Sequence, residues 1–390
     1  MLIITLLLAG VVPVAAEVFV QCPGDFDGDA VPDSVDPAHP NAVCAHLAAG
    51  DGFVNMADGR LQYVFGFSDV TGLPPEQVMQ YAMMGANLPA PTISVKEGQE
   101  LYLTLTNVGM MMRPDLFDPH SVHWHGFANA ASIFDGLPET SISVNMGSSL
   151  TYYYKVNEPG TYMYHCHVEA AEHMQMGMLG NLYVLPAQND LPDGTDLAGF
   201  THHTGYTYAY NDGDGSTYYD VDYPIQIAAF DPVFHDASLN VQPLPFALMN
   251  DTYPLLNGRG YPDTIIDAPL ANSMDGRLSQ PVDSLIEAAA GDRILLRISS
   301  LSTISYFTLR SIGPPFQVVG KSARILRGPD GRNLYYTSNS VTLGGGESID
   351  AIIDTTGARP GVYFIYASNL YALSNDSEDF GGMMTEIHLY

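Results

Sequence analysis

The chain has 390 residues, and 46% of them are hydrophobic, which is enough for two globular domains with cores of their own. Its formal net charge is −29, with only 14 lysines and arginines, which excludes nucleic acid as a partner because phosphate contacts need a basic surface. The acidic surface suits a cationic substrate, but solubility is the simpler interpretation. Many tyrosines, glycines and prolines between short alternating runs predict an all-β fold made of sandwiches.

Residues 1–16 read MLIITLLLAGVVPVAA and predict a cleaved signal peptide. The apolar run is too short for an ordinary membrane span, and Val14 and Ala16 supply small residues ahead of a cleavage site before Glu17. The positively charged start of a typical signal peptide is missing, so a single N-terminal anchor is the alternative. We expect a secreted or periplasmic protein.

Residues 17–58 form an acidic segment bounded by cysteines. In an oxidising compartment Cys22 can pair with Cys44, which leaves Cys166 unpaired. Within the segment, carboxylates recur around a glycine with a spacing that can wrap Ca²⁺, at Asp25, Asp27, Asp29 and Asp33. This loop resembles the short calcium loops of thrombospondin-type repeats, and a solvated acidic turn is the alternative interpretation.

Strand-like runs fill residues 59–190 and 222–390, and a polar linker is predicted at 191–221. The clearest strand patterns in the first part cover residues 92–106, 150–156, 161–167 and 181–185. The second part repeats the first, because 95–108 matches 288–301, 144–168 matches 342–369, and 177–184 matches 382–389. The chain is therefore predicted to hold two related β-sandwiches in tandem.

Two histidine clusters in the first part carry the chemistry. The first cluster is His120-Ser-Val-His123-Trp-His125, and the second is His165-Cys166-His167, followed by His173 and Met178. Side chains on a strand alternate between its two faces. The four histidines 123, 125, 165 and 167 are therefore expected on one side, and His120 with Cys166 on the other.

Two imidazoles, a thiolate and a weak axial thioether are the donors of a blue-copper site, and they would come from His120, Cys166, His173 and Met178. Copper binding also accounts for the unpaired cysteine, because the thiolate is the ligand. The four other imidazoles suit further copper ions with an exchangeable oxygen ligand.

These motifs resemble the copper-rich domain of the multicopper oxidases, the laccase-like cupredoxins. The resemblance implies a type 1 copper on His120, Cys166, His173 and Met178, a type 2 copper on His123, and type 3 coppers on His125, His165 and His167. It further implies that electrons from a small reducing substrate enter at type 1 copper and pass through Cys166 to its neighbouring histidines, where O₂ is reduced to water. One spacing departs from the family: His173 follows Cys166 by seven residues instead of five, and Met174 and Met176 are rival axial ligands.

The second part lacks these ligands. In the internal alignment the first cluster meets Ser302, Ser305 and Phe307, the HCH triplet meets Tyr366, Ala367 and Ser368, and only Met178 keeps a counterpart, Met383. The family's three-copper cluster uses eight histidines, of which this chain offers four. We therefore expect a homo-oligomer in which two copies face each other and complete the cluster.

Two other interpretations remain open. The chain resembles the two-domain copper nitrite reductases, which would imply one type 2 copper, but Ser368 and His123 stand where those enzymes use a histidine and an aspartate. A type 1 copper electron-transfer protein is the third, although a pure carrier has no need for four further histidines. The prediction is a laccase-like copper oxidoreductase built from two tandem cupredoxin-like Greek-key sandwiches, with copper and possible calcium as cofactors.

Overall fold

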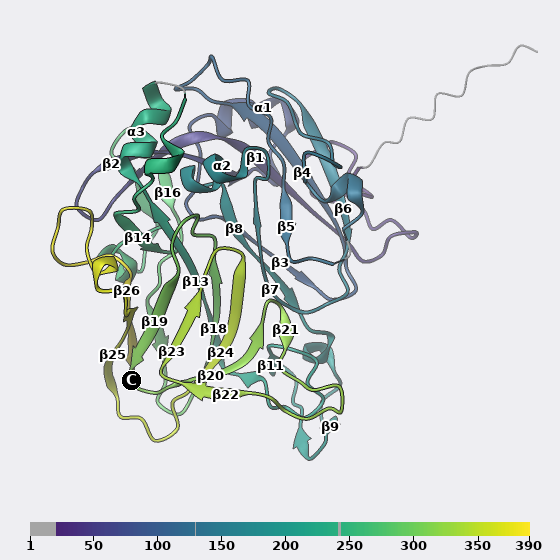
Figure 1. Ribbon diagram of the computed structural model, residues 1–390. Coiled ribbons are helices and arrows are strands. Elements are labelled where there is room, and N and C mark those ends of the chain that lie inside the picture. Colours follow the sequence, from purple (N-terminus) through teal and green to yellow (C-terminus); the bar gives the residue numbers. More distant parts are fainter. Residues whose placement is uncertain (1–20, 129, 241–242) are drawn as a thin grey trace, which may run out of the picture.

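Two β-sandwiches make up most of the chain (Figure 1). The computed structural model describes residues 21–128, 130–240 and 243–390. The predicted signal peptide, residues 1–16, lies outside the described residues. Within the described part, no helix is long and apolar enough to cross a bilayer.

The first sandwich has two four-stranded sheets, ordered β2-β1-β4-β6 and β3-β8-β7-β5. Their strands are β1 (Ala42–Asn55), β2 (Leu61–Asp69), β3 (Ala90–Lys96), β4 (Glu100–Gly109), β5 (His123–His125), β6 (Ser149–Lys155), β7 (Gly160–His165) and β8 (Leu179–Leu185). One pair in each sheet is parallel, β1 with β4 and β3 with β8, and the other pairs are antiparallel. This mixture arises because the chain crosses repeatedly between the two sheets.

The second sandwich repeats this topology. The order β2-β1-β4-β6 recurs as β14-β13-β18-β24, extended by β20, β21 and β22, and β3-β8-β7-β5 recurs as β17-β26-β25-β19, extended by β23. The strands are β13 (Val221–Phe230), β14 (Tyr253–Leu256), β17 (Ile286–Ala288), β18 (Arg293–Ser300), β19 (Phe307–Ile312), β20 (Phe316–Lys321), β21 (Arg324–Ile325), β22 (Tyr336–Ser338), β23 (Ser340–Leu343), β24 (Glu347–Asp354), β25 (Gly361–Ala367) and β26 (Met384–Leu389). The prediction of two related Greek-key sandwiches is confirmed.

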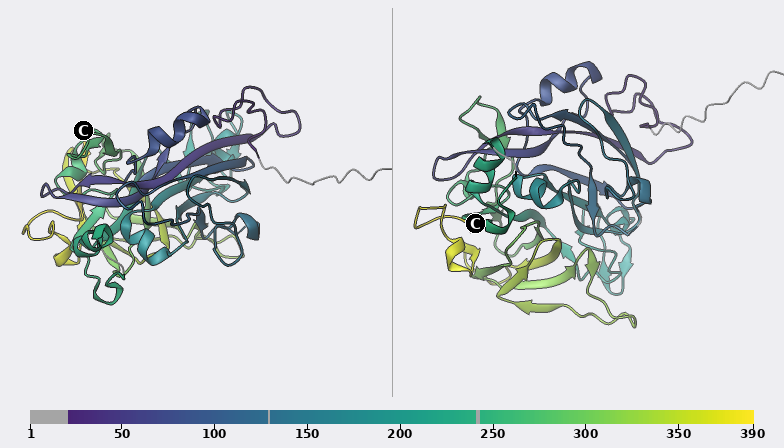
Figure 2. Two further views of the ribbon diagram at one scale, coloured as in Figure 1. Left: turned by 90° about the horizontal axis from the view of Figure 1, so that it is seen from above. Right: turned by 45° about the horizontal axis from the view of Figure 1, so that its top comes forward.

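Short elements fill the connections. The helices are α1 (Pro75–Ala82), α2 (Ala170–Met176) and α3 (Pro232–Asn240), with single 3₁₀ turns at Ser132–Phe134, Ala187–Asp190, Phe246–Leu248, Asp263–Ile265 and Leu370–Ala372. Small two-stranded pairs are formed by β9 (Asp196–Leu197) with β10 (Phe200–Thr201), β11 (Thr207–Tyr208) with β12 (Tyr218–Tyr219), and β15 (Leu270–Ala271) with β16 (Leu278–Gln280). Two of these pairs lie in the segment predicted as a polar linker, where Tyr208 and Tyr210 are buried. Figure 2 shows the two sandwiches from two further directions.

Two of the predicted strands are shorter in the structure. Residues 92–106, expected as one run, are divided between β3 and β4, which belong to different sheets. Gly98 lies at the break with a φ of 86°, a backbone conformation that glycine adopts without strain, so the chain can turn from one sheet into the other. Residues 161–167 end their strand at His165, and helix α2 follows soon after.

The two cores differ in composition. The first is rich in aromatic side chains, such as Trp124 and Tyr154, and also contains Cys166 and Met178. The second consists mostly of isoleucine, leucine and valine. The copper-binding chemistry predicted from the sequence thus coincides with the aromatic core.

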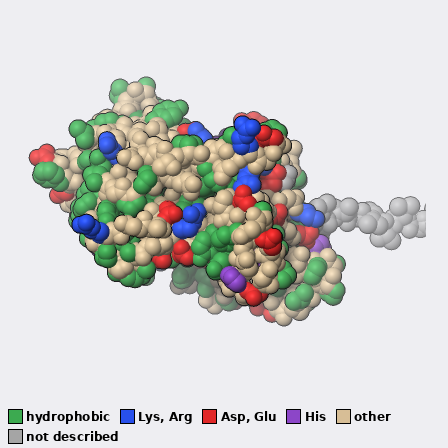
Figure 3. Space-filling model, turned by 90° about the horizontal axis from the view of Figure 1, so that it is seen from below, with side chains coloured by type: hydrophobic (Ala, Val, Ile, Leu, Met, Phe, Trp, Pro, Cys, Tyr) green, Lys and Arg blue, Asp and Glu red, His purple; other side chains and the backbone are tan. Residues whose placement is uncertain are grey.

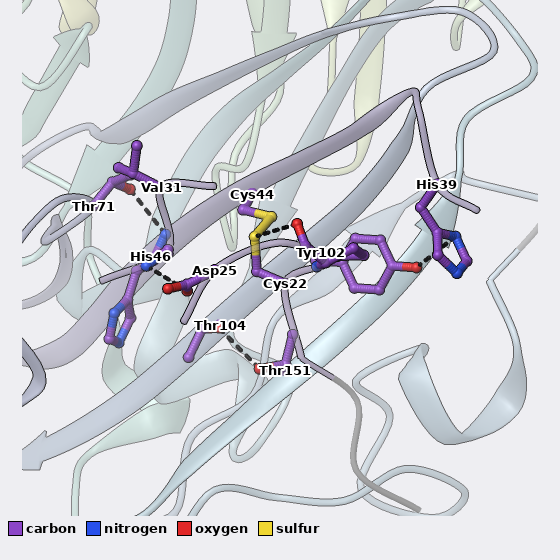
Figure 4. Close-up of a disulfide and its surroundings, with 12 residues drawn as sticks. Cys22, Asp25, Val31, His39, Cys44, His46, Thr71, Tyr102, Thr104 and Thr151 are labelled. Carbon is purple, nitrogen blue, oxygen red and sulfur yellow. Dashed lines mark hydrogen bonds between the residues drawn. A yellow bond between two sulfur atoms is a disulfide. The ribbon is translucent and has the colours of Figure 1, made fainter. Parts of the chain in front are cut away.

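The N-terminal segment is fastened to strand β1 by a disulfide between Cys22 and Cys44, as predicted (Figure 4). The two Cα atoms lie 5.8 Å apart, which is an ordinary spacing for such a bond. On the face shown in Figure 3, acidic and basic side chains are interspersed, and the acidic ones do not gather into one patch.

Candidate copper centre

Strand pairing brings the two histidine clusters together. Strands β5 and β7 run antiparallel with His123 opposite His165, so the HWH and HCH motifs lie side by side. His120 precedes β5 and pairs with Val144, and His173 lies on helix α2. Residues more than forty positions apart in sequence therefore share one end of the first sandwich.

We call the first donor set the thiol group; it comprises His120, Cys166, His173 and Met178. The sulfur of Cys166 lies 3.2 Å from Nδ1 of His173 and 3.8 Å from Nδ1 of His120. All four side chains are buried, with relative exposures of 0%. The Met178 N–H donates to the His173 carbonyl (2.9 Å), and the Met178 carbonyl accepts from the Cys166 N–H (3.2 Å), which fixes the thioether residue beside both ligands.

Burial sets the protonation states of the thiol group. It raises the pKa of Cys166 to about 12, lowers the pKa of His173 to about 4, and holds the pKa of His120 well below its usual value. A thiolate in this environment is costly unless a cation lies beside it, and neutral imidazole is the form that binds metal. One thiol and two imidazoles, converging in a buried site, fit a copper ion.

A carboxylate lies next to the thiol group. Within the described part of the chain, Nε2 of His120 and Nε2 of His173 are buried without a hydrogen-bond partner. Asp118 Oδ2 lies 4.0 Å from Nε2 of His173, and burial, followed by repulsion from Glu169, raises the pKa of this aspartate. Sequence reasoning did not identify Asp118, because an aspartate two residues before a histidine carries no recognisable signal.

The other four histidines line a cavity of about 440 Å³ between the sandwiches. The first sandwich contributes His123, His125, His165, His167, Ala170, Ala171 and Met174, and the second contributes Leu301, Ser302, Thr303, Ile304, Ser305, Tyr306, Gly345 and Gly346. We call this space the four-histidine cavity. Ligand atoms of three of its histidines, His123, His125 and His165, lie within 4.8 Å of one another. The ring of His167 is 5.0 Å from that of His123.

Hydrogen bonds orient two of these rings. Nδ1 of His123 lies 2.6 Å from the carbonyl oxygen of Asp135, and Nδ1 of His165 lies 2.9 Å from that of Cys166. Donation from Nδ1 leaves the Nε2 lone pair free for a metal. Burial lowers the pKa of His165 to about 3 and also lowers the pKa values of His123 and His125, so these rings are neutral at ordinary pH.

The second sandwich closes one side of the cavity at short range. A Cβ atom added to Gly346 would lie 2.6 Å from Nε2 of His125, so this position has no room for a side chain. The Thr303 hydroxyl donates to Oε1 of Gln175 (2.8 Å), which joins the cavity wall to helix α2. These wall residues were not predicted, because they lie well over a hundred positions from the histidines and carry no ligand pattern.

Met174 and Met176, the two rival axial ligands, lie in different environments. Met174 lines the four-histidine cavity, and Met176 is buried in the aromatic core together with Met178. The spacing between Cys166 and His173 is two residues longer than in the family, and helix α2 lies in this interval. The helix places His173, not Ala171, beside the sulfur of Cys166.

The aspartate loop holds part of the predicted calcium set together. Ligand atoms of Asp25, Asp27 and Asp29 lie within 4.8 Å of one another. Asp33 instead accepts a hydrogen bond from the Phe26 N–H at 2.9 Å. Asp25 is already bonded to backbone N–H groups of the loop, so calcium binding stays a prediction from the sequence.

Residues 69–189 match the family described as multicopper oxidase. The chain is 37% identical over 84 residues to the multicopper oxidase MmcO of Mycobacterium tuberculosis, covering 22% of this chain and 15% of that one. It is 25% identical over 311 residues to copper resistance protein A of Escherichia coli, covering 75% and 45%. The chain thus spans less than half the length of these two relatives.

Solved structures share the fold. A blue copper oxidase from Nitrosomonas europaea superposes with a TM-score of 0.63 at 23% identity, covering 89% of this chain and 86% of that one. A copper nitrite reductase from the same organism superposes with a TM-score of 0.57 at 17% identity, covering 90% and 94%. The likeness assigns the cupredoxin fold to both sandwiches.

Proposed function

We propose that the chain is a laccase-like member of the multicopper oxidases, which takes single electrons from a small reducing substrate and reduces O₂ to water. The observation that supports this most strongly is the adjacency of two donor sets. Cys166 lies in the thiol group, and its chain neighbours His165 and His167 both line the four-histidine cavity.

Each residue has a proposed role. His120, Cys166, His173 and Met178 would hold type 1 copper, His123 type 2 copper, and His125, His165 and His167 type 3 copper. Copper in the thiol group would exchange single electrons with the substrate, and copper in the cavity would pass them to O₂. The Asp135 and Cys166 carbonyls hold two imidazoles in the tautomer that binds metal.

The cavity needs a partner to reach the family's full histidine set. Its second wall offers the hydroxyls of Ser302, Thr303 and Ser305 where further histidines are needed. We propose that a second copy of the chain supplies them. Because the chain's own residues 301–306 occupy one side, the copy must approach where His123, His125 and His167 stay partly exposed.

A nitrite reductase-like enzyme with one type 2 copper is the second candidate. It is favoured by the compact triad of His123, His125 and His165, which could hold a single metal ion. A type 1 electron carrier is less well supported, because it leaves the cavity histidines without a role. In each case the disulfide favours a secreted or periplasmic protein, where an oxidising environment preserves it.

Copper content, combined with O₂ uptake in the presence of a reductant, tests the proposal. The face-to-face oxidase should contain about 2.5 coppers per chain, since two type 1 ions and one shared three-copper cluster serve two chains. About two coppers per chain would favour the single type 2 site, and about one would leave only a carrier. O₂ uptake that does not depend on copper would contradict all three.

A further inference from the structure

The HWH motif repeats the geometry of the HCH motif with an indole in place of the thiol. Trp124 lies between His123 and His125, just as Cys166 lies between His165 and His167. Both central side chains are buried, at 0% exposure, while the flanking imidazoles line the cavity. Because Trp124 is bonded in the chain to His123 and His125, the indole, like the thiol, is joined to two cavity histidines by a short covalent path, although strand neighbours point to opposite faces.

The indole begins a stack of aromatic rings in the first core. Its ring lies 4.0 Å from that of Tyr154 with an interplanar angle of 15°. Tyr152 continues the stack, 6.2 Å from Tyr154 at an angle of 6°. Tryptophan and tyrosine are among the side chains most readily oxidised by one electron, so these three rings form a contiguous set of possible donors.

Proton acceptors decide which ring gives up an electron most easily. The Tyr154 hydroxyl donates to the Phe134 carbonyl at 2.8 Å, and burial raises its pKa well above the usual value. A carbonyl is a poor base, so oxidation of this phenol has nowhere to leave its proton. The Trp124 indole N–H has no hydrogen-bond partner among the described residues, but an indole can lose an electron and keep its proton.

The reduction of one O₂ to two waters takes four electrons and four protons. The thiol group can hold one copper, and the cavity supplies four of the family's eight histidines within one chain. When O₂ meets a centre in which only three coppers are reduced, the reaction lacks its fourth electron. Trp124, which lies between two cavity histidines in the chain, could provide it without losing a proton.

We propose that Trp124 is a redox-active residue that gives one electron to the four-histidine centre during O₂ reduction. O₂ is the oxidant, the four protons come from solvent, and the indole becomes a radical cation that a later electron from the reducing substrate restores. The stacked ring of Tyr154 stabilises the positive charge, as π-systems do for nearby cations. The inference rests on the proposed oxidase function.

The test uses copper-loaded full-length protein that is reduced with a small reductant without thiols, such as a hydroquinone. The reduced protein is mixed with O₂ and frozen at intervals for electron paramagnetic resonance. O₂ uptake is measured on the same samples. Trp124 is the chain's only tryptophan, so protein grown with ring-deuterated tryptophan identifies an indole radical by the narrowing of its signal. This labelling leaves the fold unchanged.

We expect the signal of an organic radical, whose line width narrows on tryptophan deuteration and whose intensity falls at least tenfold in Trp124→Phe. That variant should keep its type 1 colour and copper content. Tyr162→Phe is the matched control, since Tyr162 is a buried tyrosine of the same core outside the parallel stack, and the radical should persist in it. O₂ uptake without any such radical would overturn the inference alone. Absence of O₂ uptake would overturn the proposed function and the inference with it.

Discussion

The first and second sandwiches share a strand order but differ in what their loops carry. At the end of β7 the first sandwich places imidazoles and a thiol, while the second ends β25 with Tyr366 and Ala367; the Ala367 N–H donates to the Met383 carbonyl as the Cys166 N–H does to that of Met178. The second nevertheless has a continuous aliphatic core. This fold is therefore stabilised by its strands and core, and the candidate metal ligands are additions to loops and strand ends.

The largest expected effect comes from removing the thiol of the first sandwich. Cys166→Ser should abolish the blue colour and lower oxidase activity more than about a hundredfold, because the soft ligand and the path to the cavity histidines are both lost. Visible absorption and O₂ uptake measure these two effects. Ala367→Ser, at the aligned position of the second sandwich, should change neither. Persistent activity in the first variant would contradict the electron route through Cys166.

Removing a cavity imidazole should damage the four-histidine cavity and spare the thiol group. His123→Ala should retain the type 1 colour yet reduce O₂ uptake by more than about a hundredfold, because the ring lines the cavity and not the thiol group. Ser302→Ala, on the opposite wall, is the control. Loss of the colour in His123→Ala would mean that the assignment of faces is wrong.

A smaller effect is expected where the second sandwich touches the first. Gly346→Ala places a Cβ atom against His125 Nε2 and should weaken copper binding in the cavity by about 10- to 100-fold, while type 1 colour is kept. Metal titration followed by electron paramagnetic resonance would measure the change. Gly357 has a similar φ, 78° against 85°, and open space around it, so Gly357→Ala has the same backbone cost without the contact. Equal effects of both variants would indicate backbone strain alone.

The smallest effect concerns the contact between the sandwiches at Asp251, which accepts a hydrogen bond from Nε2 of Gln175. Burial raises the pKa of Asp251 to about 7. A carboxyl with a raised folded pKa binds its proton more tightly in the native state, so its stabilisation is complete below about pH 4 and is lost as pH rises through about 7. Asp251→Asn cannot ionise and still offers an acceptor to Gln175.

We therefore expect this variant to be more stable than the parent by about 1–2 kcal/mol at pH 8, and less so at pH 5. Urea unfolding at the two pH values measures the difference. Asp330→Asn, on the exposed surface, is the control variant. A gain of equal size at both pH values would rule out the ionisation of Asp251 as its cause.

The sequence allowed the fold and the thiol group to be predicted because both are encoded locally. Alternation sorted Cys166 from His165 and His167, and the internal repeat revealed two sandwiches. The break at Gly98 was missed although residues 96–100 read KEGQE, a polar run around a glycine that is typical of a turn. Gly346 and Asp118 were missed for another reason: their roles exist only through contacts with residues distant in sequence, and no local pattern marks them.

The alternation at residues 165–167 has a genetic consequence. Deleting or inserting one codon within this strand end would turn the thiol toward the cavity and the imidazoles toward the core, damaging both sites in a single event. Substitutions can change the sites one at a time, but shifts of length cannot. A shift of length at this strand end therefore changes both donor sets together.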